Sequence, residues 1–205
     1  MTDSPYDITG LILAGGASLR MGQPKAQMRL SGQTILERVR SKLTPICREI
    51  IIVTNRPTDL LEYDLEIVQD LVLNRGPLGG LTTGLFYAHY PWTMVLACDL
   101  PFVKIELLSF LAQKTLAARQ GPHALIPQHQ AGWEPLVAAY SKSCLKSALK
   151  LLSLQRSRLY DLKRCGVFFE LVPEEELRKL DPDLTSFINI NTPEDFERAR
   201  DFLEG

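Results

Sequence analysis

The sequence predicts a single α/β domain, a three-layer α/β/α sandwich built around a mostly parallel sheet. Short runs of β-branched apolar residues, such as Ile-Ile-Ile-Val within residues 49–54, are typical of strands buried on both faces. Longer stretches with helical spacing separate these runs, which is the order of β-α-β units. The length of 205 residues, 45% of them hydrophobic, suits one globular domain over residues 1–205.

Each element of the first 120 residues has its own local signal. Apolar runs that end in a polar or turn residue predict strands at 9–13, 49–54, 65–69 and 93–97. Helical periodicity predicts helices at 34–43, 78–88 and 104–118, and Pro45 stops the first of them. Open α/β sheets bind ligands at the carboxyl ends of their strands, so we expect a ligand at that edge of this half of the chain, about 1–120.

The pattern becomes less regular after Gly121. Strands are expected at 123–127 and 135–141, and a last helix should begin with Thr192 as N-cap and Pro193 in its first turn. Residues 142–164 contain seven basic residues and one acid, Asp161. Either a solvated helix face or a surface for an anionic substrate explains this run, and both interpretations stay open. We expect residues 121–205 to form the second half of this domain.

Composition and charge exclude several classes of protein. A net charge of −1 gives no bulk attraction for nucleic acid or for an acidic membrane. No apolar run reaches the roughly 20 residues that span a bilayer, and the polar, acidic N-terminus does not resemble a secretory signal. The four cysteines and three histidines are scattered without metal-ligand spacing, so structural zinc is not expected. We therefore expect a cytoplasmic protein with reduced thiols.

The most informative segment is the loop that follows the first strand, Leu-Ala-Gly-Gly-Ala-Ser-Leu-Arg-Met-Gly-Gln-Pro-Lys at residues 13–25. Gly15 and Gly16 let the backbone turn sharply and bring its N–H groups against phosphate oxygens. Arg20 and Lys25 add positive charge, and the loop contains no acid. It fits neither a P-loop, which needs G-x-x-x-x-G-K-[ST], nor a dinucleotide fingerprint, which needs G-x-G-x-x-G. The composition is that of a polyphosphate-binding loop.

This loop closely resembles the signature of GT-A-type nucleotidyltransferases, and within them most resembles the molybdenum cofactor guanylyltransferases (MobA). The resemblance implies a Rossmann-like nucleotidyltransferase (GT-A) fold. It also implies that the loop wraps the triphosphate of GTP, that Arg20 and Lys25 neutralise it, and that backbone groups at Leu13, Ala14 and Gly15, with Gly16, contact the nucleotide.

Later segments resemble the same family. Asn55, in Val-Thr-Asn-Arg, and Asp70, in Val-Gln-Asp, fall where the family places nucleotide-binding residues. Both residue types also favour turns at strand ends. Gly-Pro-Leu-Gly-Gly-Leu at 76–81 resembles a glycine-rich segment beside the nucleotide, and it also suits a tight strand-to-helix turn.

Two further matches concern the metal and the acceptor. Asp99, in Leu-Ala-Cys-Asp-Leu-Pro, matches the family's Asp-x-Pro element, whose aspartate binds Mg²⁺. A turn residue is the alternative for a lone strand-end aspartate, but a triphosphate on the same sheet edge requires a divalent ion. Asn189 and Asn191 match an Asn-x-Asn-Thr-Pro element; two apart on an extended segment, they would point the same way, toward a polar heterocyclic acceptor.

The resemblance implies an enzyme that transfers GMP from GTP to the terminal phosphate of molybdopterin and releases pyrophosphate. Arg20, Lys25 and Asp99 are the expected catalytic residues, with residues of about 1–120 as the nucleotide-binding half and about 121–205 as the acceptor-binding half. A cytidylyltransferase acting on molybdopterin or another small phosphate is the alternative within enzymes, and a non-catalytic nucleotide-binding module is the alternative of another class. A protein that delivers the pterin is a further expected partner.

Overall fold

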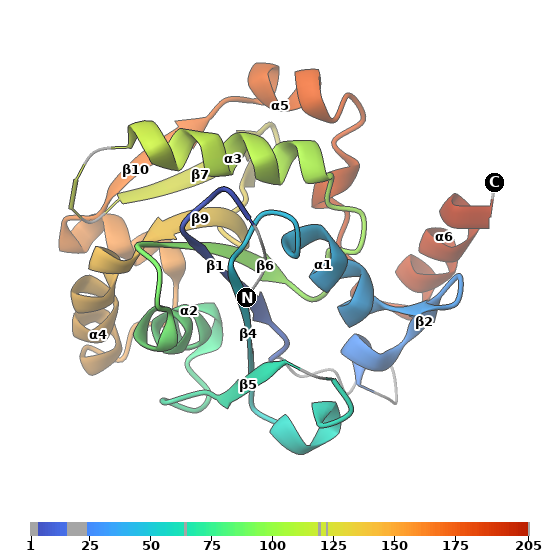
Figure 1. Ribbon diagram of the computed structural model, residues 1–205, viewed down its shortest axis with the longest axis horizontal. Coiled ribbons are helices and arrows are strands. Elements are labelled where there is room, and N and C mark those ends of the chain that lie inside the picture. The colour runs from blue at the N-terminus through green and yellow to red at the C-terminus, as the bar shows by residue number, and fades with distance from the viewer. Residues whose placement is uncertain (1–3, 16–23, 64, 119, 122, 205) are drawn as a thin grey trace.

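In the computed structural model, residues 4–15, 24–63, 65–118, 120–121 and 123–204 are described. The strands of the main sheet are β1 (Ile8–Leu13), β4 (Glu49–Thr54), β5 (Glu66–Gln69), β6 (Trp92–Ala97), β7 (His123–His129), β8 (Gly132–Trp133), β9 (Val137–Ser141) and β10 (Phe168–Val172). Their order is β10-β7-β9-β6-β1-β4-β5, with β8 paired to β7 (Figure 1). Strand β9 runs antiparallel to β6 and β7, β8 runs antiparallel to β7, and the other pairs are parallel. The predicted mostly parallel sheet is confirmed.

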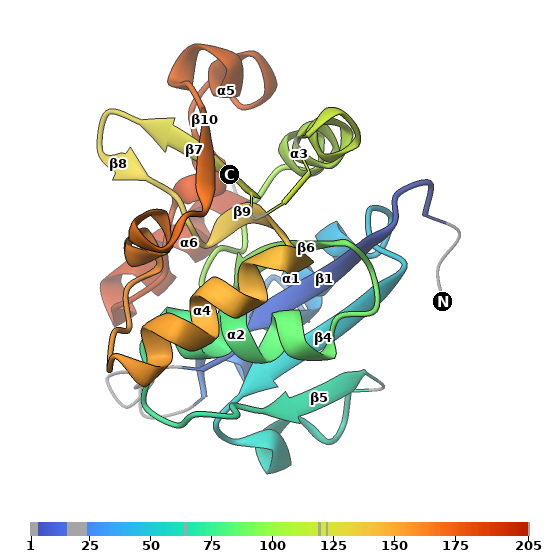
Figure 2. The same cartoon turned by 90° about the vertical axis from the view of Figure 1, so that its left-hand side faces the viewer.

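Helices cover both faces of this sheet. They are α1 (Ile35–Leu43), α2 (Gly76–Tyr87), α3 (Ile105–Ala117), α4 (Leu145–Ser153), α5 (Glu174–Leu180) and α6 (Pro193–Glu204). Neighbouring residues of β1 face opposite layers: Ile12 packs with α1 and α3, whereas Leu11 packs with α2 and α4. Figure 2 shows α2 and α4 side by side on the second face. This arrangement is the expected three-layer sandwich, and its one sheet includes strands from both halves of the chain.

Helix starts follow their local signals closely. Thr34 caps α1 with a reciprocal pair of bonds: Glu37 N donates to its hydroxyl (3.1 Å), and Thr34 N donates to the Glu37 carboxylate (2.7 Å). Thr192 and Asp195 form the same pair at α6, with distances of 3.1 and 3.0 Å. Such capping boxes satisfy backbone donors that the first helical turn leaves free. The prediction that Thr192 caps the last helix is therefore confirmed.

Several elements differ from the sequence prediction. The helix expected from residue 78 begins at Gly76, the strand expected at 135–141 begins at Val137, and the strand expected to end at 127 continues to His129. A short hairpin, β2 (Arg29–Leu30) with β3 (Gln33–Thr34), was not predicted. Two-residue strands are too short to show alternation in the sequence. The prediction also gave no separate elements for β10 and α5.

Helix α2 lies unusually close to β1 because glycines face the strand. An ideal Cβ on Gly84 would lie 2.2 Å from Leu11 Cδ2, and one on Gly80 would lie 2.8 Å from Leu13 Cδ2. Real Cβ atoms do not approach other atoms so closely, so these positions need glycine for packing. The glycine-rich segment at 76–81 therefore has a structural role in seating the helix.

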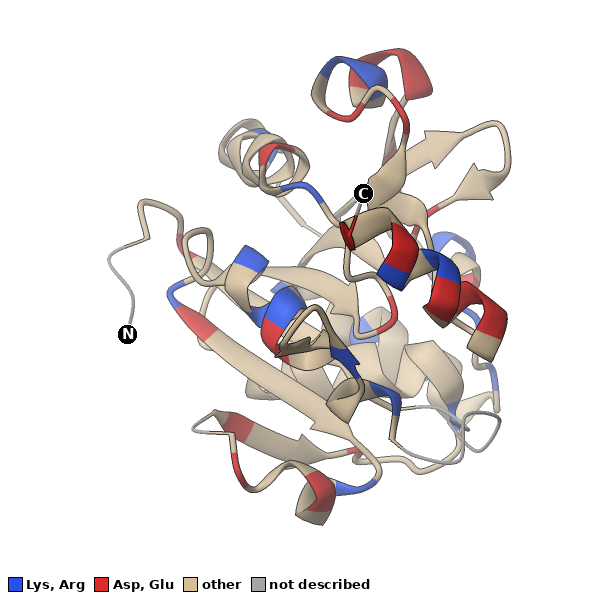
Figure 3. Ribbon diagram, turned by 90° about the vertical axis from the view of Figure 1, so that its right-hand side faces the viewer, with Lys and Arg blue, Asp and Glu red and all other residues tan. Residues whose placement is uncertain are grey.

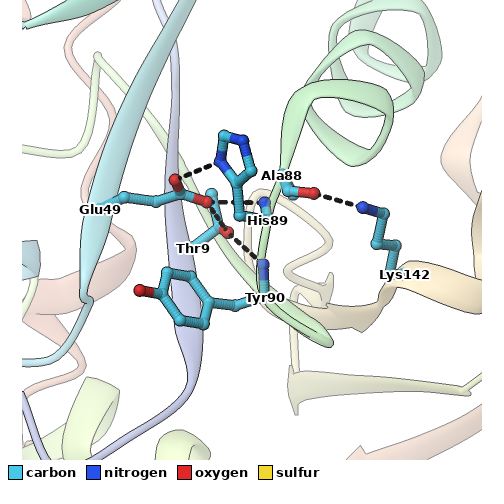
Figure 4. A network of polar contacts seen from close by, with 6 residues as sticks. All are labelled: Thr9, Glu49, Ala88, His89, Tyr90 and Lys142. Carbon is cyan, nitrogen blue, oxygen red and sulfur yellow. Dashed lines mark hydrogen bonds and ion pairs between the residues drawn. The ribbon is translucent and has the colours of Figure 1, made fainter.

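A polar network at the amino-terminal ends of β1 and β4 joins these strands to the connection between α2 and β6 (Figure 4). The Glu49 carboxylate accepts hydrogen bonds from the Thr9 hydroxyl and from His89 N (2.8 Å), and its other oxygen contacts His89 Nδ1 at 2.7 Å. Lys142 Nζ donates to the carbonyl of Ala88. Lys142, the first cation of the basic run, thus has a structural contact far from the carboxyl ends of the strands.

Helix α6 lies apart from the main sheet, against the β2-β3 hairpin (Figure 1). Ala199 on this helix packs with Leu30 of the hairpin and with Ile190 and Phe102, which come from the segments before α6 and after β6. This helix contains both acidic and basic residues (Figure 3). This small apolar cluster is separate from those on the two faces of the sheet, and it fixes residues 189–191 beside the end of β6. Among the described residues, no helix is long and apolar enough to cross a membrane.

Candidate active site

Three parallel strands end at one level and bring their following residues together. Leu13 at the end of β1 pairs with Val53 of β4 and with Ala97 of β6. The ladder continues one residue further, because Ala14 N donates to Val53 O (2.9 Å) and Cys98 N donates to Leu13 O (3.1 Å). Open α/β sheets bind ligands outside these carboxyl ends. The predicted site residues that follow β1, β4 and β6 therefore share one edge.

Lys25, Asp99 and Asn191 converge at this edge from three distant parts of the chain. Lys25 Nζ lies 3.5 Å from Asp99 Oδ2 and donates a 3.1 Å hydrogen bond to Asn191 Oδ1. Ile190 N donates to the Asp99 carbonyl at 2.9 Å, which ties the asparagine segment to the end of β6. The structure thus brings together a predicted phosphate-binding cation, a predicted metal ligand and a predicted acceptor residue.

Two polar atoms at the site lack a partner within the described part of the chain. The Oδ1 atoms of Asp99 and Asn55 are both buried and accept no hydrogen bond there. The Asn55 amide lies beside Gly15, since an ideal Cβ on that glycine would be 3.9 Å from Asn55 Nδ2. Buried oxygens without a donor are rare in folded proteins. These two are suited to meet a donor or a cation supplied by a ligand.

Asp70 follows β5 at the same edge and is held against α2. Burial raises the pKa of its carboxyl group, and a hydrogen bond from the Thr83 hydroxyl at 3.3 Å opposes that shift. The Thr83 hydroxyl also accepts from Leu71 N at 3.0 Å. Thr83 was not predicted as a site residue. It lies within a helix, and its neighbours in the sequence give no sign that it contacts Asp70, 13 residues earlier.

The structure gives fewer contacts with the site for the remaining predicted residues. Asn189 and Asn191 are both exposed and flank buried Ile190, and Asn189 Nδ2 lies 3.5 Å from the carbonyl of Phe187. Gly16 and Arg20 lie outside the described residues. Cys98 is adjacent to Asp99, but burial raises the pKa of its thiol to about 12. That thiol stays protonated at neutral pH and is not an activated nucleophile.

Among the described residues, no group of three or more His, Cys, Asp or Glu side chains could hold a metal ion by itself. Among these residues, the edge instead offers the ammonium group of Lys25, the carboxylates of Asp70 and Asp99, and neutral amides. A set of this kind matches a ligand that brings its own anionic oxygens, because those oxygens can complete a metal's coordination shell.

Comparison with known proteins assigns the chain to a family. Residues 10–164 match the MobA-like NTP transferase domain, a range that includes Gly15, Lys25, Asn55, Asp70 and Asp99. The chain belongs to the MobA-like NTP transferase family. Membership of this family makes it a nucleotidyltransferase, as the loop of residues 13–25 predicted.

Full-length relatives agree with this assignment. The molybdenum cofactor guanylyltransferase of Desulfosudis oleivorans is 36% identical over 198 residues, which cover 94% of each chain. The probable molybdenum cofactor guanylyltransferase of Pelotomaculum thermopropionicum is 34% identical and covers 96% of this chain and 93% of its own. These alignments extend over nearly the whole chain, whereas the domain match ends before Asn189.

Solved structures show the same fold. Molybdopterin-guanine dinucleotide biosynthesis protein A from Archaeoglobus fulgidus has a TM-score of 0.82 and 31% identity, over 96% of this chain and 98% of its own. A 2-C-methyl-D-erythritol 4-phosphate cytidylyltransferase from Thermus thermophilus has a TM-score of 0.69 at 12% identity, over 95% and 98% of the two chains. The second likeness shows only that the nucleotidyltransferase fold is shared. The expected Rossmann-like nucleotidyltransferase fold is confirmed.

Proposed function

We propose that this chain is a molybdenum cofactor guanylyltransferase, which transfers GMP from GTP to the terminal phosphate of molybdopterin and releases pyrophosphate. The observation that carries the proposal is the convergence of Lys25, Asp99 and Asn191 at the carboxyl ends of the strands. The names of the full-length relatives support the choice of nucleotide and acceptor.

The reaction needs positioning and charge neutralisation more than a protein nucleophile. An oxygen of the acceptor phosphate attacks the α-phosphorus of GTP, a new P–O bond forms, and the bond to the β-phosphate oxygen breaks. Lys25 and Arg20 neutralise the phosphates, and the backbone at Leu13, Ala14, Gly15 and Gly16 orients the nucleotide. Holding two anions in line in this way lowers the entropic part of the barrier and the electrostatic repulsion between them.

Asp99 fits a divalent cation, for which we propose Mg²⁺. Its buried Oδ1 has no partner among the described residues, and carboxylate oxygens are ligands that Mg²⁺ prefers. One or two carboxylates suffice when substrate phosphates and water supply the remaining ligands. Bound there, the ion would stabilise negative charge on the phosphates. Lys25, 3.5 Å from the other carboxylate oxygen, keeps Asp99 oriented.

Asn55 and Asp70 are proposed to bind the nucleotide on the β4-β5 side of the site. The unpartnered Asn55 Oδ1 accepts from an N–H group of the ligand. A carboxylate such as Asp70 accepts well from the adjacent ring N–H and amino group of guanine. Cytosine offers a single amino donor beside acceptor atoms, so this arrangement favours GTP over CTP.

Asn189 and Asn191 are proposed to contact the acceptor, from the half formed by residues 121–205. A protein that delivers the pterin remains a prediction, and so does the division of this single domain into a nucleotide half and an acceptor half. A cytoplasmic location belongs to the same proposal, because buried thiols such as those of Cys98 and Cys144 form no disulfide, as in a reducing compartment.

The deciding experiment measures pyrophosphate release by the purified chain, given GTP, Mg²⁺ and molybdopterin under anaerobic conditions. We expect release that depends on both GTP and molybdopterin. Parallel reactions contain CTP in place of GTP, or sugar phosphates in place of molybdopterin. Turnover with CTP alone would make the chain a cytidylyltransferase. Nucleotide binding without turnover on any acceptor would indicate a non-catalytic module.

A further inference from the structure

An aromatic and cationic cavity lies outside the residues assigned so far. Its volume is about 410 Å³, and it is lined by Trp133, Arg158, Tyr160, Asp161, Lys163 and Arg164. Trp133 belongs to β8, and the other residues come from the η5 segment (Leu159–Cys165) or directly precede it. Sequence analysis gave Trp133 no role and left the basic run 142–164 with two interpretations.

Specific contacts hold the side chains that line this cavity. The Tyr160 hydroxyl donates to the Trp133 carbonyl at 3.0 Å, and the two rings are 5.3 Å apart. Phe169 of β10 meets the Trp133 ring edge-on at 5.9 Å. Leu159 and Leu162 are buried and anchor the η5 segment, which leaves Tyr160 and Lys163 exposed on its outer side.

The charge of the cavity suits an anionic ring compound. Lys163 Nζ lies 5.7 Å from the centre of the Trp133 ring, and Arg158 and Arg164 add two further cations. The single acid, Asp161, is largely buried and paired with Arg164 at 3.4 Å. Aromatic faces beside cations bind flat heterocycles by stacking and anionic groups by charge. By contrast, a second cavity of about 440 Å³, near Phe110, is lined by Lys179 together with Glu175 and Glu176.

The sheet topology places this cavity on the acceptor side of the reaction. Asn55 and Asp70 follow β4 and β5, on one side of β1 and β6. Trp133 lies on β8, which pairs with β7 on the other side. The segment after Trp133 returns to the site, because the Leu136 carbonyl accepts from Ala97 N at 3.1 Å, two residues before Asp99. In-line transfer requires that the attacking group approach from the side opposite the leaving pyrophosphate.

We infer that the Trp133 cavity binds the fused heterocyclic ring of the acceptor, so that the acceptor's phosphate extends toward Asp99. This inference rests on the proposed function and adds the residues that select a ring-bearing phosphate over other small phosphates. Trp133 supplies the stacking surface, Tyr160 fixes the position of the Trp133 backbone, and Lys163 covers the ring and attracts the anion. The basic run is thereby divided: its last part, at 158–164, serves the acceptor, whereas Lys142 has the structural contact with Ala88.

The test compares Michaelis constants for the two substrates in Trp133→Ala and Lys163→Met. Loss of a stacking side chain should raise the KM for molybdopterin about tenfold or more. The Kd for GTP, titrated without acceptor, should stay within about twofold of wild type. Lys163→Met keeps the aliphatic stem, and should raise the acceptor KM by a smaller factor that shrinks at high salt. Trp133→Phe should recover part of the acceptor affinity.

Matched controls separate this role from general destabilisation. Phe86→Ala removes an exposed aromatic ring from the far end of α2, and Lys150→Ala removes an exposed cation of the same basic run on α4. Both should leave the acceptor KM unchanged. An unchanged acceptor KM in Trp133→Ala, or an equal loss for GTP and acceptor, would overturn the inference while wild-type turnover still supported the proposed function. Absence of turnover in the wild type would instead overturn the function.

A direct readout covers the case in which Trp133→Ala does not fold. The chain contains two tryptophans, so Trp133 is the sole indole emitter in a Trp92→Phe background. Addition of molybdopterin should quench that emission with a midpoint near the acceptor KM. Addition of GTP alone should not. No quenching by saturating molybdopterin would contradict ring stacking on Trp133.

Discussion

The two oxygens of Asp99 have different surroundings, and this difference defines its proposed role. Oδ2 faces Lys25 Nζ at 3.5 Å, while buried Oδ1 has no partner in the described part of the chain. A residue that merely stabilised the turn after β6 would be expected to accept a local backbone N–H. The unpartnered oxygen is better explained by a cation that arrives with the nucleotide.

Asp99→Asn should therefore fold normally and lose most of its transfer activity, on the order of 10²-fold or more, since metal stabilisation of charge is worth several kcal/mol. GTP binding without metal should stay near the wild-type value. Activity should recover in part when Mg²⁺ is raised. The measurement is the steady-state rate of both proteins at increasing Mg²⁺ concentrations. A wild-type rate at limiting Mg²⁺ would reduce Asp99 to a turn residue and make Asp70 the next candidate.

Asp70, a proposed nucleotide-binding residue, is expected to lower the stability of the ligand-free protein. Burial raises the pKa of its carboxyl group, so the folded state disfavours the ionised form. A group with a raised folded pKa contributes stability below its unfolded pKa and loses that contribution as the pH rises through the folded pKa. At pH 7 the buried charge is therefore a net cost, unless a ligand donor meets it.

Asp70→Asn should raise the free energy of unfolding of the ligand-free chain at pH 7, because the neutral amide keeps the acceptor for Thr83 and removes the buried charge. It should weaken GTP binding by roughly tenfold, as expected for loss of a charge-assisted hydrogen bond. Urea denaturation at pH 7, paired with a GTP titration, measures both changes. Lower stability with unchanged GTP affinity would assign Asp70 to the fold alone.

At the scale of elements, the structure separates two asparagines that the sequence pairs. Asn191 accepts a hydrogen bond from Lys25, whereas the amide of Asn189 donates to the carbonyl of Phe187, two residues before it. Both asparagines are exposed and flank buried Ile190, which anchors the segment against Phe102. The segment between η6 (Thr185–Phe187) and α6 therefore presents the amide of Asn191 to Lys25, and the amide of Asn189 to its own backbone.

Asn189→Ala should raise the KM for molybdopterin several-fold and leave the GTP Kd near wild type. Asn191→Ala should weaken both substrates, because it also releases Lys25 from one of its partners. The control is Asn74→Ala, a change in the loop before α2. Equal effects of Asn189→Ala on GTP and acceptor would point to a structural role before the Thr192 cap.

The contact between α2 and β1 yields a stability prediction at the same scale. Gly84→Ala places a methyl group where Leu11 Cδ2 now lies 2.2 Å away, and Leu11 is fully buried. Overpacking of this kind costs about 1–3 kcal/mol, partly offset by about 1 kcal/mol of helix propensity. Thermal or urea unfolding should show net destabilisation, and the effect should be less than additive with Leu11→Ala. A stabilised Gly84→Ala would contradict the close approach.

Features that depend on neighbouring residues could be predicted from the sequence, whereas features that depend on contacts between distant residues could not. The cap at Thr192 and the apolar run of β4 are encoded within a few residues, and both were predicted correctly. The reversed direction of β9 depends on pairing with distant strands, which periodicity does not show. Strand-end logic predicted that Gly15 and Asp99 share an edge. The Lys25–Asn191 contact joins residues 166 apart, and no spacing rule predicts it.

At the scale of the whole molecule, the two ends of the parallel strands differ in their polar contacts. The carboxyl edge holds two buried oxygens, at Asn55 and Asp99, that have no partner among the described residues, and there Asp99 also meets Lys25. The amino edge holds the Glu49 network, in which the carboxylate is met by Thr9, the His89 backbone and the His89 ring (Figure 4). These contacts tie β1 and β4 to the chain entering β6, although the buried Thr93 hydroxyl nearby has no partner in the described part of the chain. Unpartnered groups cost stability, and only the carboxyl edge combines them with the charged pair of Lys25 and Asp99.

Glu49→Gln should accordingly reduce the pH dependence of unfolding. Burial alone would raise the pKa of Glu49, but the hydrogen bonds from Thr9 and His89 outweigh it, and the net result is a lowered pKa. A lowered folded pKa contributes stability that is present above the unfolded value of 4.5 and is lost as the pH falls through the folded pKa. The difference in unfolding free energy between wild type and Glu49→Gln should be about 1–3 kcal/mol at pH 7 and should shrink below about pH 4.5. Urea titrations of both chains from pH 3 to pH 7 measure this difference, and GTP affinity should not change, because Glu49 lies at the edge opposite the nucleotide. A difference that stayed constant with pH would mean that packing, and not the charge of Glu49, stabilises this edge.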